Sequence, residues 1–556
     1  MQLSFNKKIV IILLSSFLFG QSESPTRYSL KASFYDTSLY NGLKSNVIAE
    51  IKLMGDSLTW FGTGQGLALH NGNQVFSFLS TEDSLVNQQT TELLPLGGIP
   101  AIAVKGDTLA VSFSGDNGSI QVGHGLVISY NAQDTSGVSW NYFEQPVDLE
   151  VDTLKPFGEG FYRCLPVTVP EANVTYDSYI SGQYLWIASW AGGLRRYNME
   201  EGNWENVPLP MDNQDSLSLC NGFDESDAFG RPVLSNYYLN PRDPADGGNH
   251  NHKAFSVLAY GDTVWAGTAN GINKGIIIDE WVQLDDGNQQ LLNCIEWEHY
   301  SYESHNLSGN FVVGIAKQEW QGKTTIWAAT MNADNPNETR GLSYTRDDGL
   351  TWDTALLGER IYNIFSKDSL ILASSQSGLW KSYDGENWAK FAPAVDTTFM
   401  VQSQILTDIV YTSVLDTRLE NPSLWVGTGN GAALSSDLQG SSWSIFQTDY
   451  DAAEFYAYPN PFSPLNHNQL NGEGYVRFHT GEIINTIIEL NIYNFAMEKV
   501  YEKNFNLNSY NGALKWNGKD LNGNLVDNGV YFVKLKYSPS LNSSPIDFWD
   551  KLIVVK

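Results

Sequence analysis

The chain has 556 residues, of which 62 are acidic and 33 basic, so its formal net charge is −29. A field of this sign repels phosphate backbones and argues against nucleic acid as a partner. Only 17% of the residues are charged, whereas 13% are aromatic, with 17 Trp and 49 Gly. This composition favours strands and tight turns over helices, and no long stretch shows the apolar spacing of an amphipathic helix.

The N-terminal segment has the features of a secretory signal peptide. Lys7 and Lys8 precede an apolar run, Ile9 to Phe19, and small or polar residues follow. The run is too short to span a membrane comfortably, and no later segment approaches the ~20 apolar residues that a span needs. We therefore expect residues 1–22 to be removed, leaving no transmembrane segment, and the protein to pass through the periplasm and to be secreted or held on the outer cell surface.

One phrase recurs seven times between residues 47 and 447: a turn, a short apolar strand that usually holds Trp, a turn of small residues and a second strand. The seven apolar strands are 58–63, 108–112, 185–189, 264–268, 326–330, 370–374 and 424–428. Another apolar strand precedes each copy, such as Ala254–Tyr260 or Ile405–Tyr411. A fourth strand is expected in most copies, near Trp140, Trp204, Trp281, Trp352, Trp388 and Trp443.

Four short strands per repeat are typical of a β-propeller blade, because one blade cannot bury both of its faces without neighbours. The sequence therefore predicts an all-β protein, with a seven-bladed β-propeller over residues 23–450. The second repeat is the most degraded, so six or eight blades stay open as alternatives. Residues 451–556 hold about seven further short strands, among them 474–479, 487–493 and 499–504, which predicts a C-terminal Ig-like β-sandwich.

Two motifs in the repeats resemble known propeller families. The phrase Trp-x-Gly-Thr-x-x-Gly-Leu resembles the repeats of two-component-regulator-type and BNR-type propellers. Residues 345–352 match the Asp-box of sialidase-like propellers, residues 382–388 are a shortened version and residues 435–443 a looser one. In that family the box is a hairpin turn at the blade periphery. The resemblance therefore implies a structural role for Thr345, Asp347, Gly349, Trp352, Ser382, Asp384, Gly385 and Trp388.

The last hundred residues resemble the type IX secretion sorting domain (type A) and the related flagellar-hook-cap Ig-like domain. The residues that carry the resemblance are Pro459, Asn460, Pro461, Phe462, Trp516, Gly518, Asp520, Gly529, Tyr531, Lys551 and Lys556. One departure is Phe495-Ala496-Met497, where the family has a Gly-containing turn. The resemblance implies export by type IX machinery, followed by cleavage or attachment to surface lipopolysaccharide. A plain Ig-like module is the alternative.

Candidate ligand-binding residues lie in the loops between the second and third strands, which share one face of a propeller. They are Gln65, Trp190, Asn270, Gln376 and Asn430. Polar amides beside one exposed Trp suit the recognition of a sugar or a peptide. The same Asn-Gly and Gln-Gly pairs also suit tight turns, so a purely structural role is the alternative.

Three long connections, 146–178, 208–253 and 285–310, join neighbouring repeats and would emerge on the same face. Connections of this length are usually functional or disordered. Each holds one of the three cysteines, Cys164, Cys220 and Cys294. We hypothesise that two of these cysteines form a disulfide that staples the connections into a cap.

The connections are also rich in groups that bind metals. They contain Asp212, Asp215, Asp224, Asp227, Asp243, Asp246, His250, His252, His299 and His305. Oxygen-rich loops could hold calcium and histidines could hold a transition metal, but neither an EF-hand nor a zinc spacing is present. We therefore predict no cofactor, with calcium as the one candidate and a solvated acidic loop as the alternative.

The sequence favours a binding protein over an enzyme. Its ligand would be a polysaccharide or a protein, held on the face that carries the connections. A glycosidase would need a pair of carboxylates, which nothing in the sequence marks, and no nucleophile elbow is present. A part of the type IX attachment machinery is a third hypothesis. Convergent carboxylates on the cap would favour the enzyme, and an aromatic cap poor in carboxylates would favour the binding protein.

Overall fold

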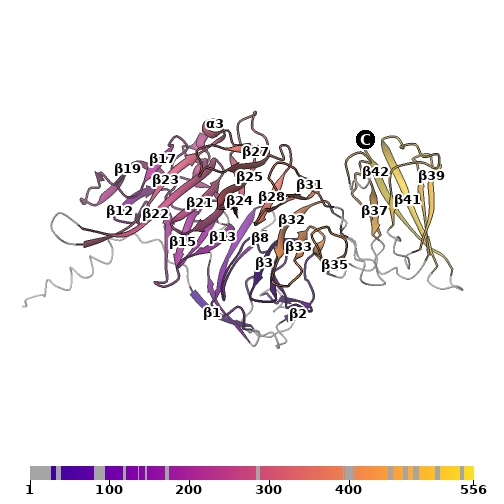
Figure 1. Ribbon diagram of the computed structural model, residues 1–556, viewed down its shortest axis with the longest axis horizontal. Coiled ribbons are helices and arrows are strands. Elements are labelled where there is room, and N and C mark those ends of the chain that lie inside the picture. Colours follow the sequence, from indigo (N-terminus) through magenta and orange to yellow (C-terminus); the bar gives the residue numbers. More distant parts are fainter. Residues whose placement is uncertain are drawn as a thin grey trace, which may run out of the picture. The chain divides into compact units, whose positions relative to one another are not determined.

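The computed structural model describes residues 27–32, 39–80, 94–116, 120–134, 137–144, 147–169, 174–283, 289–391, 394, 405, 407–448, 455–467, 474–479, 487–506, 514–538 and 544–556. The predicted signal peptide lies outside these residues. The described chain is nearly all β, in sheets of mostly four or five strands (Figure 1). It divides into two compact units, Met1–Leu39 with Phe78–Gly358, and Tyr40–Ser77 with Glu359–Lys556.

Four sheets of the first unit are antiparallel meanders, numbered here with the repeats. Sheet 2 comprises β7 (Ile102–Lys105), β8 (Thr108–Asp116), β9 (Gln121–Ser129), β10 (Val138–Phe143) and, at its edge, β1 (Arg27–Ala32). Sheet 3 comprises β13 (Thr175–Ser181), β14 (Tyr184–Ser189), β15 (Gly193–Asn198) and β16 (Asn203–Val207). Sheet 4 comprises β20 (Ala254–Tyr260), β21 (Thr263–Thr268), β22 (Gly271–Gln283), β23 (Gln289–Tyr300) and, at its edge, β17 (Ser216–Ser218). Sheet 5 comprises β24 (Phe311–Trp320), β25 (Lys323–Met331), β26 (Gly341–Thr345) and β27 (Asp353–Ala355).

The second unit contains three further meanders. Sheet 1 comprises β3 (Ile48–Met54), β4 (Leu58–Thr63), β5 (Leu67–His70), β6 (Val75–Phe78) and, at its edge, β2 (Leu39–Asn41). Sheet 6 comprises β28 (Ile361–Lys367), β29 (Leu370–Ser375), β30 (Gly378–Ser382) and β31 (Ala389–Lys390). Sheet 7 comprises β32 (Val410–Asp416), β33 (Ser423–Thr428), β34 (Gly431–Ser435) and β35 (Trp443–Phe446).

Each predicted copy of the repeat provides the second strand of one meander. The first strands of successive sheets pack together: β7 with β13, β13 with β20 and β20 with β24 in the first unit, and β28 with β32 in the second. In the second unit β3 of sheet 1 also packs on β32 of sheet 7. Meander sheets packed through their first strands give a propeller-like fold.

The small residue of the repeated phrase explains how neighbouring sheets approach. A Cβ atom at Gly267 would lie 2.6 Å from Cγ1 of Val312, on the next sheet of the first unit. A Cβ atom at Gly427 would lie 2.8 Å from Cγ2 of Ile48, on sheet 1 of the second unit. The Trp residues two positions earlier, Trp265 and Trp425, are buried between sheets. The phrase therefore pairs a large core residue with a position that has no room for a side chain.

Two expected strand positions are wrong. Trp281 was expected in the fourth strand of its repeat but lies in β22, the third strand, which pairs with β23 from Ile272–Tyr300 to Gln283–Gln289. The run Ile276–Ile278 favours a strand and carries the pairing beyond the usual blade length. The strand expected at Ile405–Tyr411 is β32, which begins only at Val410.

The connections that were expected to lack regular structure are largely folded. The third one, 285–310, contains β23 and the short helix α3 (Tyr302–His305). The other two supply a four-stranded sheet, called here the cap sheet. Its order is β11 (Leu154–Phe157), β12 (Gly160–Cys164), β19 (Pro232–Leu239) and β18 (Glu225–Ser226), with β12 and β19 parallel. Two 3₁₀ turns, η2 (Pro244–Asp246) and η3 (His250–His252), follow.

The cap sheet packs its inner face on sheets 3 and 4. Tyr162, Leu234 and Tyr237 of the cap share one core with Trp186 of sheet 3 and Trp297 of sheet 4. A disulfide joins Cys220 to Cys294 of β23, which confirms the hypothesis of a stapled cap. Cys164 is free and buried, and burial raises the pKa of its thiol to about 12, so it stays protonated.

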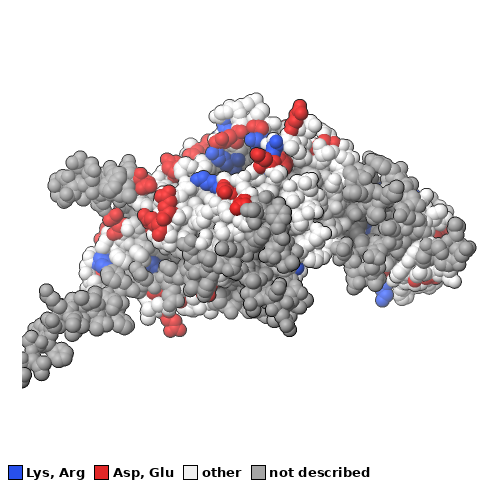
Figure 2. All heavy atoms as spheres, turned by 90° about the horizontal axis from the view of Figure 1, so that it is seen from below, with Lys and Arg blue, Asp and Glu red and all other residues white. Residues whose placement is uncertain are grey.

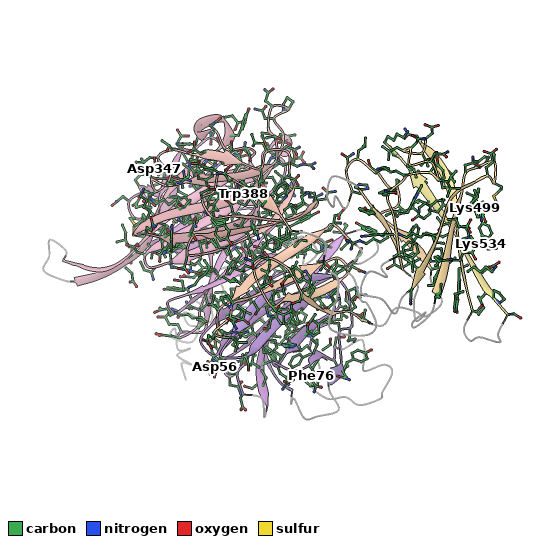
Figure 3. All side chains as sticks on the ribbon, turned by 45° about the vertical axis from the view of Figure 1, so that its right-hand side comes forward. Asp56, Phe76, Asp347, Trp388, Lys499 and Lys534 are labelled. Atoms are coloured by element: carbon green, nitrogen blue, oxygen red, sulfur yellow. A yellow bond between two sulfur atoms is a disulfide. The ribbon has the colours of Figure 1, made fainter. Side chains whose placement is uncertain are left out.

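The C-terminal module, residues 455–556, consists of two sheets around one core. One sheet comprises β36 (Tyr456–Tyr458), β37 (Val476–His479) and β40 (Lys515–Trp516), and the other β39 (Lys499–Asn506), β38 (Ile487–Tyr493), β41 (Gly529–Tyr537) and β42 (Ile546–Val554). Phe462, Trp516 and Leu535 are among the residues buried between them. Lys499 and Lys534, labelled in Figure 3, lie on the second sheet. No helix among the described residues is long and apolar enough to cross a membrane.

Candidate functional site

The five predicted ligand-binding residues all lie where they were expected, in the turn after the second strand of a meander. Trp190 and Asn270 belong to the first unit, and Gln65, Gln376 and Asn430 to the second. Trp190, Gln65 and Gln376 are exposed, whereas Asn430 is buried and accepts hydrogen bonds from Nε2 of Gln447. A role of these residues in binding stays a prediction.

These turns are closed by a hydroxyl group, which explains the repeated Thr-x-x-Gly spacing. Oγ1 of Thr428 accepts from the N–H of Asn430 at 2.9 Å and donates to the carbonyl of Gly431 at 2.8 Å. Thr63 and Thr268 make the same pair of bonds in their own turns, and Ser375 makes it with a shorter side chain. The glycine takes a positive φ, 113° at Gly431, which few other residues adopt. Turn geometry alone therefore accounts for much of the motif.

The side chains at the three predicted Asp-boxes bond within their own hairpins. In the first, Oδ1 of Asp347 accepts from the N–H and Oδ2 from the hydroxyl of Thr351, and Oγ1 of Thr345 accepts from the N–H of Gly349. Asp384 and Asp437 make equivalent bonds in sheets 6 and 7. Because these hydrogen bonds favour the ionised form, they lower the pKa of Asp347, Asp384 and Asp437. Figure 3 labels Asp347 and Trp388 at two of the hairpins.

Three of the acidic residues of the connections are engaged within the connections themselves. Asp212 accepts from the backbone N–H groups of His250 and Asn251. Asp243 caps η2, and Asp227 forms a salt bridge with Arg231 at 2.7 Å. In the part of the chain that the structure describes, no group of three His, Cys, Asp or Glu side chains is placed to hold a metal ion. Calcium binding stays a prediction without a described ligand set.

A buried polar network fixes the cap to sheet 4. Asn251 donates to Oδ1 of Asn273 at 2.8 Å and accepts from Thr268 at 2.6 Å, and all three side chains are buried. Nδ1 of the buried His252 accepts from the N–H of Asn240, and its Nε2 lies 3.2 Å from the carbonyl of Leu209. Burial lowers the pKa of His252 to about 4, so the ring is neutral at pH 7. The histidines expected to bind metal therefore include one that is a core residue.

The outer face of the cap sheet is aromatic and rich in arginine. Phe229 is 74% exposed. The guanidinium carbon of Arg231 lies 5.5 Å from the ring centroid of Phe229 and 4.8 Å from that of Phe161. Tyr238, 40% exposed, is opposite Arg163 in the parallel pairing of β12 with β19. We call Phe161, Arg163, Phe229, Arg231 and Tyr238 the cap face. Arg, Tyr and Phe are enriched at recognition surfaces.

The carboxylates beside the cap face are committed to its arginines. Glu225 accepts from Nη1 of Arg163 at 3.0 Å, and this bond lowers its pKa. Burial opposes the charge of Asp227, but hydrogen bonds from Arg231 outweigh it and lower its pKa as well. The carboxylic acid that protonates the leaving group in a glycosidase needs a raised pKa instead. Among the described residues, each carboxyl group with a shifted pKa has it lowered.

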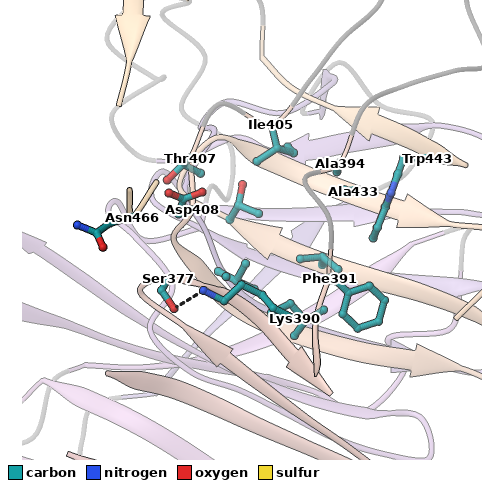
Figure 4. Close-up of a pocket in the computed structure, with 15 residues that line it drawn as sticks. Ser377, Lys390, Phe391, Ala394, Ile405, Thr407, Asp408, Ala433, Trp443 and Asn466 are labelled. Atoms are coloured by element: carbon teal, nitrogen blue, oxygen red, sulfur yellow. Dashed lines mark hydrogen bonds between the residues drawn. The ribbon is translucent and has the colours of Figure 1, made fainter. Parts of the chain in front are cut away.

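A pocket in the second unit lies between sheets 6 and 7 (Figure 4). Its wall is largely apolar and includes Phe391, Ile405 and Trp443. Its polar side chains are Ser377, Lys390, Thr407, Asp408, Thr428 and Asn466. Nζ of Lys390 donates to Oγ of Ser377 at 3.1 Å. Ser377 lies in the same turn as Gln376, and Thr428 in the same turn as Asn430. Two of the turns that hold predicted ligand-binding residues therefore border this pocket. Groups of both charges over apolar walls suit a small amphipathic molecule.

The residues of the predicted sorting motif join the two ends of the C-terminal module. Nδ2 of Asn460 donates to the carbonyl of Lys551 at 2.6 Å, and its Oδ1 accepts from the N–H of Ile553 at 2.9 Å. The buried Phe462 pairs with Val554 as in a parallel bridge. Nε1 of Trp516 donates to the carbonyl of Lys519, and the hydroxyl of Tyr531 donates to the carbonyl of Asp527. Asp520, which accepts from the N–H of Asn524, and Gly518, with a positive φ, shape the turn between them. Lys556 lies beside Asp527.

The comparisons give no family. No family model and no curated protein matches the sequence. Among solved structures the chain is similar to PorZ, an essential surface component of the type-IX secretion system of Porphyromonas gingivalis, at 12% identity over 92% of this chain and 75% of PorZ, with a TM-score of 0.33. It is similar to an ancestral GH74 enzyme at 14% identity over 92% of this chain and 62% of the enzyme, with a TM-score of 0.44. The WD40 β-propeller domain of Doa1 matches at 9% identity over 74% of this chain and 96% of that domain, with a TM-score of 0.33. Likenesses this loose carry no argument about function.

Proposed function

We propose that this chain is an extracellular binding protein. Its seven meander sheets form a seven-bladed β-propeller that recognises a polysaccharide or a protein through the cap face. Its C-terminal module is an Ig-like domain that directs export through a type IX secretion system. The observation that carries the proposal is the cap face itself. Phe229 and Tyr238 are exposed there, and the neighbouring carboxylates form salt bridges with Arg163 and Arg231.

Further observations support the separate parts of the proposal. The packing of β3 on β32 in the second unit is what the closure of a ring between the first and the last blade requires. The disulfide between Cys220 and Cys294 suits an oxidising compartment outside the cytoplasm. The residues that match the sorting motif contact one another in the C-terminal module. This supports export, since a motif that folds as one unit is what the resemblance to a sorting domain implies. Glycoside hydrolysis gains no support from the cap carboxylates.

The binding role is tested with the mature chain on an immobilised polysaccharide panel and, in parallel, on a surface-protein extract. We expect selective retention on one of the two. The double variant Phe229→Ala/Tyr238→Ala should then bind at least tenfold more weakly, since exposed aromatic anchors often contribute about 2 kcal/mol each. Trp320→Ala, at a similarly exposed aromatic residue of sheet 5, is the matched control and should bind like the wild type. Equal binding of the cap variant and the wild type would contradict the proposal.

Export is tested separately. A reporter that carries the signal peptide, residues 1–22, at its N-terminus and residues 451–556 at its C-terminus should reach the surface or the medium of a bacterium with a type IX system and stay in the periplasm of a strain that lacks it. Retention of the reporter in both strains would leave the module as a plain Ig-like domain and would not affect the binding proposal.

A further inference from the structure

Two consecutive arginines of β15 are buried on opposite faces of sheet 3. Arg195 is 2% exposed and Arg196 is 1% exposed. Successive side chains of a strand point to opposite faces, so the two guanidinium groups enter different layers of the first unit. A buried charge is tolerated only when it is paired and hydrogen-bonded, so each group needs a counter-charge.

Arg196, of which only Nη1 lacks a hydrogen-bond partner among the described residues, shows how this fold surrounds such a group. Its Nε donates to Glu205 at 2.6 Å, and its Nη2 donates to Asn293 at 2.8 Å. Its guanidinium carbon lies 4.5 Å from the ring centroid of Tyr184 and 5.3 Å from that of Phe157. An acid, an amide and aromatic faces are the usual surroundings of a buried arginine.

Arg195 has none of these. Its Nε, Nη1 and Nη2 atoms are all buried, and none of them donates a hydrogen bond within the structure. Burial lowers its pKa, and the nearby charge of Asp148 acts against that shift. An arginine nevertheless stays protonated in a protein, so a positive charge with five N–H donors is enclosed here.

The nearest acidic group is already used. One carboxylate oxygen of Asp148 accepts from Nζ of Lys155 at 2.7 Å, and the other accepts from the N–H of Val167 at 2.8 Å. Asp148 is therefore engaged by Lys155 and Val167, and neither of its oxygens accepts a hydrogen bond from the Arg195 guanidinium. Tyr162, the other group that acts electrostatically on Arg195, is neutral because burial raises its pKa well above 10. The buried Asp152, whose Oδ1 also lacks a hydrogen-bond partner among the described residues, acts with Asp148 and Lys155 on Cys164 and is not among the groups that act on Arg195.

We propose that Arg195 binds a small monovalent inorganic anion of the halide class, chloride being the physiological example. The site lies between sheet 3 and the residue 147–169 segment of the cap. The anion must be small because the guanidinium is almost fully enclosed, and a weakly hydrated one suits it because the guanidinium is itself weakly hydrated. The bound anion accepts the hydrogen bonds of the guanidinium that Asp148 does not accept, and it stabilises the attachment of the cap. This inference is independent of the proposed function.

The test uses the full mature chain at constant ionic strength, with chloride exchanged for gluconate, which is too large to enter. Because a ligand that binds only the folded state stabilises it by mass action, the Tm should rise by about 3 °C between 1 and 100 mM chloride. Crystals soaked in bromide should show an anomalous peak within hydrogen-bonding distance of the Arg195 guanidinium. Bromide diffraction from the wild type keeps the proposal testable even where a variant fails to fold.

Two variants locate the effect. Arg195→Met keeps the length of the side chain without its charge, so its Tm should no longer depend on chloride. Arg196→Met, the matched control, should be less stable but should keep the chloride dependence of the wild type. The proposal is overturned by a wild-type Tm that is equal in chloride and gluconate with no bromide at Arg195, since water would then satisfy the guanidinium. Chloride dependence that survives in Arg195→Met would also overturn it.

Discussion

The meander sheets and the cap are held together in different ways. In the turns and Asp-boxes of the sheets, each side chain bonds to backbone within four residues: Thr428 with Gly431, or Asp347 with Thr351. In the cap the partners are far apart in sequence. Asp212 binds the N–H of Asn251, Tyr237 binds the carbonyl of Leu209, and Cys220 is joined to Cys294 across 74 residues.

This difference has a physical consequence. A bond between near neighbours costs little chain entropy to close and can be repeated in every blade, so the loss of one copy has a small effect. A bond between distant residues is made once and closes a long loop, so its loss affects the whole cap. The same uniqueness makes the cap the region where specific recognition is expected, whereas the repeated turns serve the fold.

Removing the disulfide should give the largest effect. The variant Cys220→Ser/Cys294→Ser should lose about 4 kcal/mol of unfolding free energy, the chain-entropy value for a loop of this length. Denaturant unfolding with protease digestion should show that the cap is cut before the sheets. Cys164→Ala, at the free buried cysteine, serves as the control. Equal protease resistance of the double variant and the wild type would break the comparison between cap and sheets.

Acid should act on the cap through His252. Its pKa is about 4 in the folded protein and near 6.5 in the unfolded chain, so the unfolded chain binds the proton more readily between these values. Stability is therefore full above pH 6.5 and falls as the pH drops, by about 2 kcal/mol between pH 7 and 5. His252→Gln should lower the stability at pH 7 but remove this part of the pH dependence. Denaturant titrations at the two pH values measure it, and an equal pH slope in both proteins would contradict the assignment.

A single turn should matter least. Thr428→Val removes the hydroxyl that bonds Asn430 and Gly431 and should cost about 1 kcal/mol. Hydrogen exchange should quicken at the N–H of Asn430 and leave the cap unchanged. Thr428→Ser keeps the hydroxyl and should behave like the wild type. A change in exchange that spreads to other sheets would show that the turns are less independent than their bonding indicates.

Local patterns made the sheets predictable. The repeated phrase located all seven second strands, because Trp, small residues and turn residues follow one another within about ten positions. The cap sheet was missed, because β12 and β19 pair in parallel across some seventy residues that no local pattern connects. A disulfide was predicted, but the partners could not be chosen among three cysteines without knowing that Cys164 faces the core.

The candidate site was predicted only in outline. The face that carries the connections was indicated, and the turn residues were placed correctly. Phe229, Tyr238 and their arginines were not singled out. The apolar and aromatic residues of Pro232–Leu239 favour a strand, but Tyr237 and Tyr238 are identical in sequence, and only the structure shows that Tyr237 faces inward and Tyr238 outward. Arg195 and Arg196 are indistinguishable in sequence, and only the packing separates a satisfied charge from an unsatisfied one.

The C-terminal module is completed by its last strand. Asn460 and Phe462, at its beginning, bond to β42 near its end, so the two borders of the module close on each other. A polypeptide that stops before Ile546 lacks β42, and the core around Phe462 and Leu552 stays open. Translation must therefore continue through that strand before the module can fold. A module without β42 would therefore leave Phe462 without its partner Val554 and would expose apolar side chains that the folded module buries.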